Sequence, residues 1–219
     1  MIILGLTDIH GQTAGINRIL AELGAADVAV MVGDITHFGG TGDVKRVISA
    51  VRPYVPRILG VSGNCDYIEV DRCLDNESMN LHAKGRHING IGFVGVGGSM
   101  ITPFHTPNEY TEAELESFLA SAASNVSPDA PLVLVSHQPP SHTACDRLRS
   151  GQHVGSHSVR SFIEKHQPLV CFTGHIHEAV AIDQIGSTRI VNSGLLGKGR
   201  YAFARIEGGE ALVEIRRIF

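Results

Sequence analysis

Seven side chains of types that commonly bind metal ions stand directly after short apolar runs of the sequence. They are Asp8 and His10 in TDIH, Asp34 in VGDITH, Asn64 in SGNCD, His137 in VSHQPP, and His175 and His177 in TGHIH. A single loop could carry an Asp or a His for many reasons, but five loops that do so in the same way indicate one site built from all of them. A mixture of carboxylate, imidazole and carboxamide donors suits a pair of divalent transition-metal ions rather than a structural zinc site.

The apolar runs predict the strands that position these donors. In the first part of the chain, strands are expected at residues 2–6, 28–32 and 58–62, with helices at 13–24 and 43–51 between them. This β-α-β-α-β order predicts parallel strands covered by helices. Because ligands bind beyond the carboxyl ends of the strands in open α/β sheets, donors that are far apart in the sequence are expected to converge at one edge.

The remaining segments extend this α/β pattern. Buried strands are expected at 91–96, 132–136 and 169–173, and helices after the capping-box pair Thr111 and Glu114 and at 158–166. Antiparallel strands are expected at 179–185, 189–191, 201–206 and 212–218, and irregular structure at 66–90. With no repeat, linker or low-complexity tract in the sequence, residues 1–219 are expected to form a single domain.

Composition and charge narrow the classes of function. The chain has 219 residues, of which 43% are hydrophobic and 18% are charged, and its formal net charge is −4. An acidic balance argues against a general nucleic-acid binder, which needs a basic face. No apolar run is long enough to span a membrane, the start lacks the features of a secretory leader, and the four cysteines form no CxxC pair. We therefore expect a cytoplasmic protein with neither a nucleic-acid nor a membrane partner.

The ordered series DxH, GDxxH, GNCD, SHxPP and GHIH resembles the calcineurin-like metallophosphoesterase superfamily, and its GNCD form resembles a branch of small bacterial and archaeal phosphoesterases. The resemblance implies the metallo-dependent phosphatase fold, a four-layer α/β/β/α sandwich with two mixed sheets. It implies one metal ion on Asp8, His10, Asp34 and His177, and a second on Asp34, Asn64, His137 and His175.

The same resemblance implies a dinuclear-metal-dependent phosphoester hydrolase that acts on a small phosphoester. In such a mechanism, ions about 3.5–4 Å apart hold a bridging hydroxide that attacks the phosphorus in line with the leaving oxygen. Asn64 is then a catalytic residue as well as a ligand. Mn, Fe, Zn, Co and Ni all tolerate these donors, and we favour Mn.

Cys65 is the departure from the family pattern, since many members have His at this position of the GNH[D/E] motif. A thiol is a weak hydrogen-bond donor and a poor match for a general acid, which typically contributes about 10²–10⁴ in rate. The departure favours a phosphodiesterase over a phosphomonoesterase, with a small or nucleotide-like substrate that has a good leaving group. His153, before a predicted helix, is a candidate replacement acid.

Other interpretations remain open at this stage. Each donor alone fits a structural role, such as a helix cap for Asp34 or a turn for Asn64. The main alternative function is a non-catalytic metal-binding scaffold module of the same fold, and a DNA-repair nuclease is a third. The physiological substrate, the native metal, the identity of any general acid and the oligomeric state are not determined by the sequence.

Overall fold

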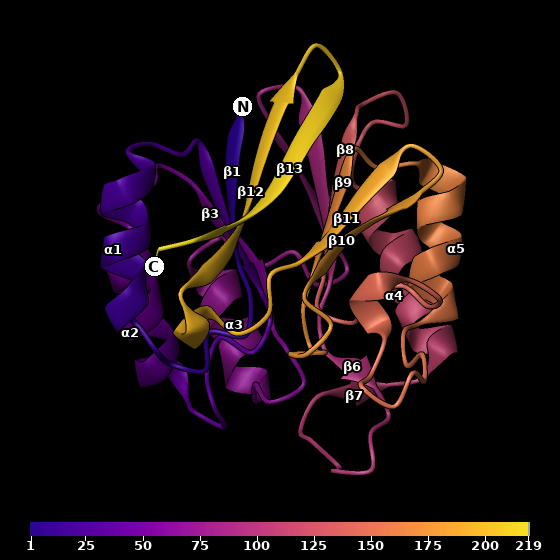
Figure 1. The fold of residues 1–219 in the computed structure, drawn as a ribbon, viewed down its shortest axis with the longest axis horizontal. Helices are drawn as coiled ribbons and strands as arrows, with labels where there is room; N and C mark the ends of the chain where they lie inside the picture. Colours follow the sequence, from indigo (N-terminus) through magenta and orange to yellow (C-terminus); the bar gives the residue numbers. More distant parts are fainter. Residues whose placement is uncertain (219) are drawn as a thin grey trace.

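The computed structural model describes residues 1–218 and places two β-sheets face to face, with helices on both outer sides (Figure 1). In spatial order, the first sheet contains β13 (Glu210–Arg217), β12 (Arg200–Glu207), β1 (Ile2–Leu6), β2 (Val28–Val32) and β3 (Ile58–Val61). β1, β2 and β3 are parallel, whereas β12 runs antiparallel to both β1 and β13. The sheet is therefore mixed.

The second sheet is also mixed. In spatial order, it contains β10 (Ala181–Ile185), β11 (Thr188–Asn192), β9 (Val170–Thr173), β8 (Leu132–Ser136), β5 (Ile91–Val96) and β4 (Lys84–Ile88). Its four inner strands are parallel, and the edge strands β10 and β4 are antiparallel to their neighbours. A separate parallel pair is formed by β6 (Ser99–Met100) and β7 (Glu109–Tyr110).

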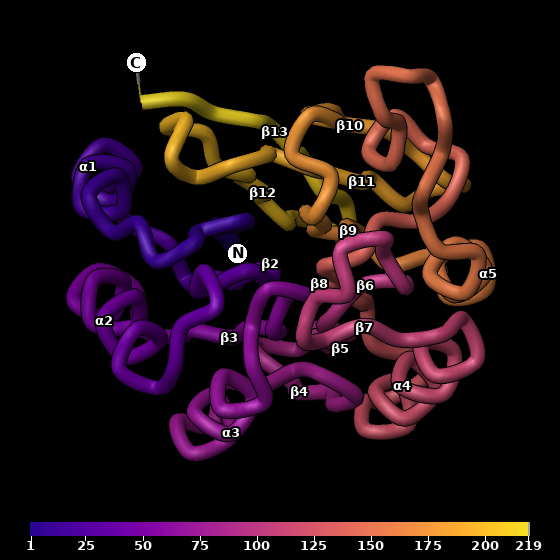
Figure 2. Tube along the Cα trace, turned by 90° about the horizontal axis from the view of Figure 1, so that it is seen from below, coloured from indigo at the N-terminus to yellow at the C-terminus, as the bar shows by residue number. Residues whose placement is uncertain are grey.

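The helices complete a four-layer arrangement. α1 (Ala14–Leu23), α2 (Thr41–Val51) and α3 (Ile68–Asn76) lie on the outer side of the first sheet. α4 (Glu112–Ser124) and α5 (His157–His166) lie on the outer side of the second. Figure 2 shows the two helical layers on opposite flanks of the strands. Two short 3₁₀ turns, η1 (Ala144–Asp146) and η2 (Leu196–Lys198), lie in the connections. The predicted α/β/β/α sandwich is confirmed.

Successive residues of a strand point to opposite faces of the sheet. The strands are continuous apolar runs in the sequence because both of these faces are buried. In β2, Val30 faces the other sheet, in the core between the two sheets, whereas Met31 faces the helices of the first layer. Both faces of the strand are buried, so every position is apolar. The sheets approach closely at Gly5, where a Cβ atom would lie 2.7 Å from the Phe172 ring.

One predicted segment is wrong. Residues 66–90 were expected to be irregular, but they contain α3 and β4. The buried face of α3 includes the charged residue Asp71, which interrupts the apolar periodicity. β4 is an edge strand in which only Ile88 is buried, so it has little apolar content to detect.

Other differences are small. α2 begins at Thr41, two residues before the predicted start, and β11 pairs in parallel with β9 as well as antiparallel with β10. The capping box of α4 is confirmed, because Thr111 Oγ1 accepts from the Glu114 amide and the Glu114 carboxylate accepts from the Thr111 amide. Within residues 1–218, no helix is long and apolar enough to cross a bilayer.

Candidate metal centre

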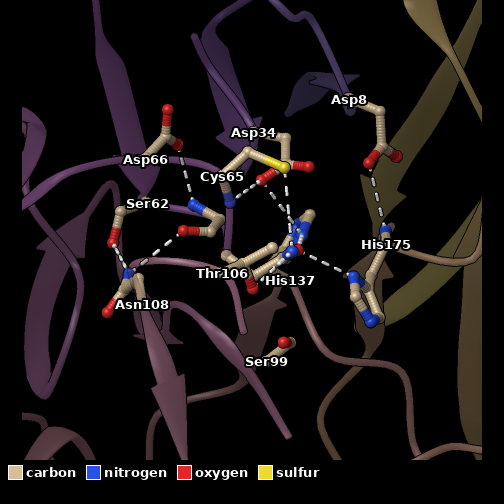
Figure 3. Close-up of polar contacts among 12 residues, drawn as sticks. Asp8, Asp34, Ser62, Cys65, Asp66, Ser99, Thr106, Asn108, His137 and His175 are labelled. Atoms are coloured by element: carbon tan, nitrogen blue, oxygen red, sulfur yellow. Dashed lines mark hydrogen bonds and ion pairs between the residues drawn. The ribbon is translucent and has the colours of Figure 1, made fainter. Parts of the chain in front are cut away.

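The seven donors predicted from the sequence lie in loops that leave the carboxyl ends of strands from both sheets. The first sheet contributes Asp8 and His10 after β1, Asp34 after β2 and Asn64 after β3, and the second contributes His137 after β8 and His175 and His177 after β9. The structure brings all seven together, and Figure 3 shows several of them converging from the two halves of the molecule.

The first donor group consists of Asp8, His10, Asp34 and His177, which each place a ligand atom within 4.8 Å of the others. The Nε2 atom of His177 lies 3.1 Å from Oδ1 of Asp8 and 3.3 Å from Nε2 of His10. Two carboxylates and two imidazoles directed at one point form a donor set that fits a divalent transition-metal ion.

The second donor group is centred on the side-chain oxygen of Asn64. Oδ1 of Asn64 lies 3.0 Å from Nε2 of His137 and 2.8 Å from Nδ1 of His175. Oδ1 of Asp34 lies 3.5 Å from the same His137 nitrogen. The other oxygen of Asp34 lies 3.6 Å from Nε2 of His10 in the first group. Asp34 therefore stands between the two groups, with one carboxylate oxygen toward each.

The orientation of His137 is set by the backbone beneath it. Its Nδ1 atom lies 2.9 Å from the Val32 carbonyl oxygen, to which Nδ1–H donates a hydrogen bond. The lone pair is therefore on Nε2, which faces Asn64 and Asp34, as a metal ligand requires. Gly33 makes room for the ring: its φ is +80°, and a Cβ atom there would lie 2.2 Å from Nδ1 of His137.

Burial keeps part of the site in the protonation states that bind metals. Desolvation lowers the pKa of His175 to about 4, so its imidazole is neutral at pH 7. Burial alone would raise the pKa of Asp8, but the hydrogen bonds from His177 and from the Thr7 hydroxyl help to lower it to about 2. Burial would lower the pKa of His177, whereas the same hydrogen bond to Asp8 raises it.

Four of the seven donors have left-handed backbone conformations. The φ angles are +50° for Asp8, +47° for His10, +44° for Asp34 and +64° for His175. This region is uncommon for residues other than glycine and costs on the order of 1–3 kcal/mol per residue. Such sharp turns let the chain reverse direction directly after each strand, so that the donors project over the strand ends.

Asp66 joins the loops that follow β2 and β3. Its buried carboxylate accepts hydrogen bonds from the amides of Ile35 and Thr36 in one loop and of Gly63 in the other, at 2.8–2.9 Å. The Thr36 hydroxyl donates another at 2.7 Å. Sequence reasoning gave Asp66 no role, although its place at the end of the SGNCD motif was a usable signal. Its contacts fix the spacing between the loops that carry Asp34 and Asn64.

A family model described as calcineurin-like phosphoesterase matches residues 1–179 of the chain. This protein belongs to that family. The match covers every donor residue described above, and the family typically binds divalent metals and hydrolyses phosphoesters. The resemblance inferred from the motif series is confirmed.

Several individual proteins are similar to this phosphoesterase in sequence or in fold. An uncharacterized protein of Methanocaldococcus jannaschii is 42% identical over 196 residues, which cover 88% of this chain and 87% of that protein. The crystal structure of TT1561 of Thermus thermophilus has a TM-score of 0.79 at 19% identity. The match covers 100% of this chain and 99% of that chain. Phosphopantetheinyl hydrolase from Mycobacterium tuberculosis has a TM-score of 0.62 at 15% identity, with 88% of each chain covered. At these identities, the two structures support the fold alone.

A pocket of about 730 Å³ opens beside the donors of this phosphoesterase, and Asn64, His175 and His177 form part of its wall. The lining of the pocket is largely apolar and includes Met100 at the end of β6 and residues 101–104 of the β6–β7 connection. Ile101 and Phe104 in this segment are 64% and 83% exposed. The volume is within the usual range of about 300–1,000 Å³ for small-molecule sites.

Cys65 lies beside both donor groups. Its backbone amide donates to Oδ1 of Asp34 at 2.9 Å, and its sulfur lies 3.7 Å from Nδ2 of Asn64. Burial and the negative charge of Asp34 raise the pKa of the thiol well above its ordinary value, so the thiol stays protonated and neutral. Because a thiol with a raised pKa does not readily release its proton, Cys65 is a poor general acid in this phosphoesterase.

His153 and His37 have surroundings different from those of the donors. Nδ1 of His153 lies 2.6 Å from a carboxylate oxygen of buried Asp146, and its ring packs against His142. It lines a neighbouring pocket rather than the one that contains Asn64. The role of His153 as a general acid stays a prediction. His37, in the loop after β2, lies against His10, with Nδ1 atoms 3.4 Å apart.

Thr106 is a site residue that sequence reasoning missed. Its hydroxyl oxygen accepts a hydrogen bond from Nδ2 of Asn64 at 3.0 Å, which turns Oδ1 of Asn64 toward the two histidines. Glu109 holds Thr106 in place by accepting from its hydroxyl and its amide. The proline-punctuated segment TPFHTP was a signal of an unusual loop in this phosphoesterase, but nothing local to it pointed to Asn64.

Proposed function

We propose that this protein is a dinuclear-metal-dependent phosphodiesterase that acts on a small or nucleotide-like phosphoester. The position of Asp34 carries the proposal, since its two carboxylate oxygens face different donor groups. A carboxylate in this position can bridge two cations. The proposed ligand sets are those the family resemblance implies: Asp8, His10, Asp34 and His177 for one ion, and Asp34, Asn64, His137 and His175 for the other.

The donors fit such a pair of ions in chemistry and protonation state. His137 presents a lone pair toward the site because its other nitrogen donates to the backbone, and buried His175 is neutral. When bound, two divalent ions would lower the pKa of a water molecule and offset the negative charge of the phosphoryl group. We favour Mn among the metals that tolerate these ligands.

The protein's own side chains orient the site. Asn64 supplies a neutral oxygen, which limits the negative charge that an anionic phosphoester meets, and Thr106 keeps that oxygen pointed inward. The preference for a diester rests on two features. The apolar wall beside the donors suits a second organic substituent on the phosphate. The neutral thiol of Cys65 offers little help to a poor leaving group.

The four cysteines are unpaired. Free thiols are usual in reducing compartments, which supports our proposal of a cytoplasmic location.

The first test is metal-dependent release of nitrophenol from bis(4-nitrophenyl) phosphate. We expect turnover with added Mn²⁺ and a loss of at least about 10³-fold in Asp34→Asn, since a metal centre supplies several kcal/mol of transition-state stabilisation. Asp129→Asn, which removes an exposed carboxylate after α4, is the matched control and should retain wild-type activity. Metal binding by calorimetry without turnover of any phosphoester would instead favour a non-catalytic module.

The second test concerns substrate class. Turnover should decrease from the bis(aryl) diester to the aryl monoester and then to an alkyl monoester, measured under the same Mn²⁺ concentration. If the alkyl monoester were hydrolysed fastest, the proposed preference for diesters with good leaving groups would be incorrect.

A further inference from the structure

The pocket beside the donors is locally cationic in a chain that is acidic overall. Its charged lining residues, apart from the histidines, are Arg149, Lys198 and Arg200 against Glu178. The whole chain has a formal net charge of −4. A local excess of positive charge next to the donors indicates that the pocket is suited to an anion in addition to its apolar contacts.

The three cations differ in what they contact. Arg149 is paired with Glu178, at 3.2 Å between Nε and the carboxylate, and its side chain is 87% exposed. Within the described residues, Lys198 and the side chain of Arg200 have no hydrogen-bond or ion-pair partner. The Nε atom of Arg200 is buried as well as unpartnered. A buried donor on a charged group is rarely left unsatisfied, so an anion in the pocket is the natural partner.

These two cations come from a part of the chain that contains none of the metal donors. Lys198 ends η2 and Arg200 begins β12, both beyond the segment 1–179 that matches the family model. The hydrolysed phosphoryl group belongs at the donors, and the apolar segment that contains Phe104 also lines the pocket. The β6–β7 loop that presents Phe104 is held by Glu109, which accepts hydrogen bonds from Thr102 and Thr106.

We infer that the substrate carries a second phosphate group, bound by Lys198 and Arg200, besides the phosphoester that is hydrolysed at the donors. An apolar face of the substrate, such as the planar base of a nucleoside, contacts Ile101 and Phe104, which line the same pocket. The chemical class is a nucleoside-like phosphodiester that bears a further terminal phosphate. This inference rests on the proposed function for the hydrolytic step.

A matched pair of chromogenic substrates tests the inference. The first is thymidine 5′-(4-nitrophenyl phosphate), and the second is the same compound with an added 3′-phosphate. In both, water adds to the 5′ phosphorus, the bond to the nitrophenyl oxygen breaks, and nitrophenolate leaves with thymidine 5′-phosphate or its 3′-phosphorylated form as the other product. The wild-type protein with Mn²⁺ should have a kcat/KM about tenfold or more higher for the bisphosphorylated compound.

Variants assign that preference to residues. Lys198→Met and Arg200→Gln should each lower the ratio of the two kcat/KM values, and Arg200→Lys should restore part of it. Lys45→Met removes an exposed lysine of α2 and should leave the ratio as in the wild type. If Lys198→Met and Arg200→Gln reduced kcat/KM for both substrates equally, these cations would contact the hydrolysed phosphate and the inference would be wrong.

Binding without turnover separates the inference from the proposed function. Calorimetric titration of the metal-free protein should give a higher affinity for thymidine 3′,5′-bisphosphate than for thymidine 5′-monophosphate, and Lys198→Met should remove the difference. This result would support the second-phosphate site even if no substrate were hydrolysed. Equal affinities for the two nucleotides, or a difference that persists in both Lys198→Met and Arg200→Gln, would overturn it.

Discussion

At the level of single residues, Cys65 is the position where this protein departs most clearly from its family's motif. Its neutral thiol lies between Asp34 and Asn64, where it can contribute little to protonating a leaving group. Under the proposed function, the rate of hydrolysis should therefore depend on how readily the leaving group departs without a proton. A leaving group whose conjugate acid has a low pKa, such as nitrophenolate, departs without a proton, whereas an alkoxide must be protonated.

Cys65→His should extend the range of substrates. We expect turnover of an alkyl phosphodiester to rise, up to the ~10²-fold lower end of what general acids contribute, while turnover of the aryl diester changes little. Cys65→Ser, which matches the size of the thiol, is the control. Steady-state rates for both esters measure the effect, and an unchanged alkyl-to-aryl ratio in Cys65→His would show that this position does not limit the enzyme.

At the level of elements, the loops after the strands set the geometry of the donors. Gly33 illustrates how closely the loop after β2 approaches β8, because the His137 ring occupies the space where a Cβ atom would lie. Gly24, at the end of α1, has a similar φ of +82°, but nothing lies within 4 Å of its Cβ position. Both glycines therefore have a positive φ, but only at Gly33 would a Cβ atom collide with a neighbouring side chain.

Gly33→Ala should both destabilise the fold and displace His137. Gly24→Ala should cost only the backbone strain, about 1–2 kcal/mol, and keep wild-type affinity for Mn²⁺. Gly33→Ala should lower the free energy of unfolding, measured with urea, by more than Gly24→Ala does. It should also weaken Mn²⁺ binding measured by calorimetry. Equal effects of the two substitutions on metal affinity would contradict the contact between Gly33 and His137.

Asp71 on α3 makes stability depend on pH. Burial raises the pKa of this carboxyl from its ordinary 3.8 to about 6, and one of its oxygens has no partner in the described part of the chain. Because the folded state holds the proton more tightly than the unfolded state, the stabilisation is present at low pH and is lost as the pH rises from about 4 to about 6.

Asp71→Asn should remove that loss. Between pH 4 and pH 7, the free energy of unfolding of the variant should rise relative to that of the wild type by at most about 3 kcal/mol, since one pKa unit corresponds to about 1.4 kcal/mol. Urea unfolding at both pH values measures the gain. Glu69→Gln, at an exposed position of the same helix, should show no comparable gain. A pH-independent difference between Asp71→Asn and the wild type would argue against the titration of Asp71.

The same elements show what the sequence could and could not predict. β2 was predictable because both of its faces are buried and every residue is apolar. The clustering of the candidate donors was predictable because each lies in a loop that follows a largely buried strand. α3 and β4 were missed because Asp71 interrupts one pattern and an edge strand needs few apolar residues. Thr106 could not be assigned to Asn64, which is 42 residues away, because only the folded loop brings them together.

At the level of the whole molecule, the candidate metal centre spans the interface between the two sheets. Asp8, Asp34 and Asn64 lie in loops that follow strands of the first sheet, and His137 and His175 in loops that follow strands of the second. Ions bound by both groups would connect the two halves of the sandwich. Metal binding should therefore stabilise the fold as a whole rather than one loop.

Thermal unfolding should respond to Mn²⁺ accordingly. A ligand at about 100 times its Kd contributes about 2.7 kcal/mol, so we expect a higher unfolding temperature with Mn²⁺ and a return to the original value after chelation. Asp34→Asn should reduce the shift, whereas His166→Gln, at the end of α5 and outside the donor groups, should keep it. A similar shift in both variants would mean that the metal acts elsewhere.

The antiparallel pairing of β1 with β12 has a consequence for synthesis of the chain on the ribosome. β1 is synthesised long before its partner on one side, which begins at Arg200. His177 contacts Asp8 across a separation of 169 residues. Pairings between such distant segments form late, because the intervening chain must first be available. The nascent polypeptide therefore has an incomplete set of candidate donors until His177 has been made, and an exposed β1 edge until β12 has emerged.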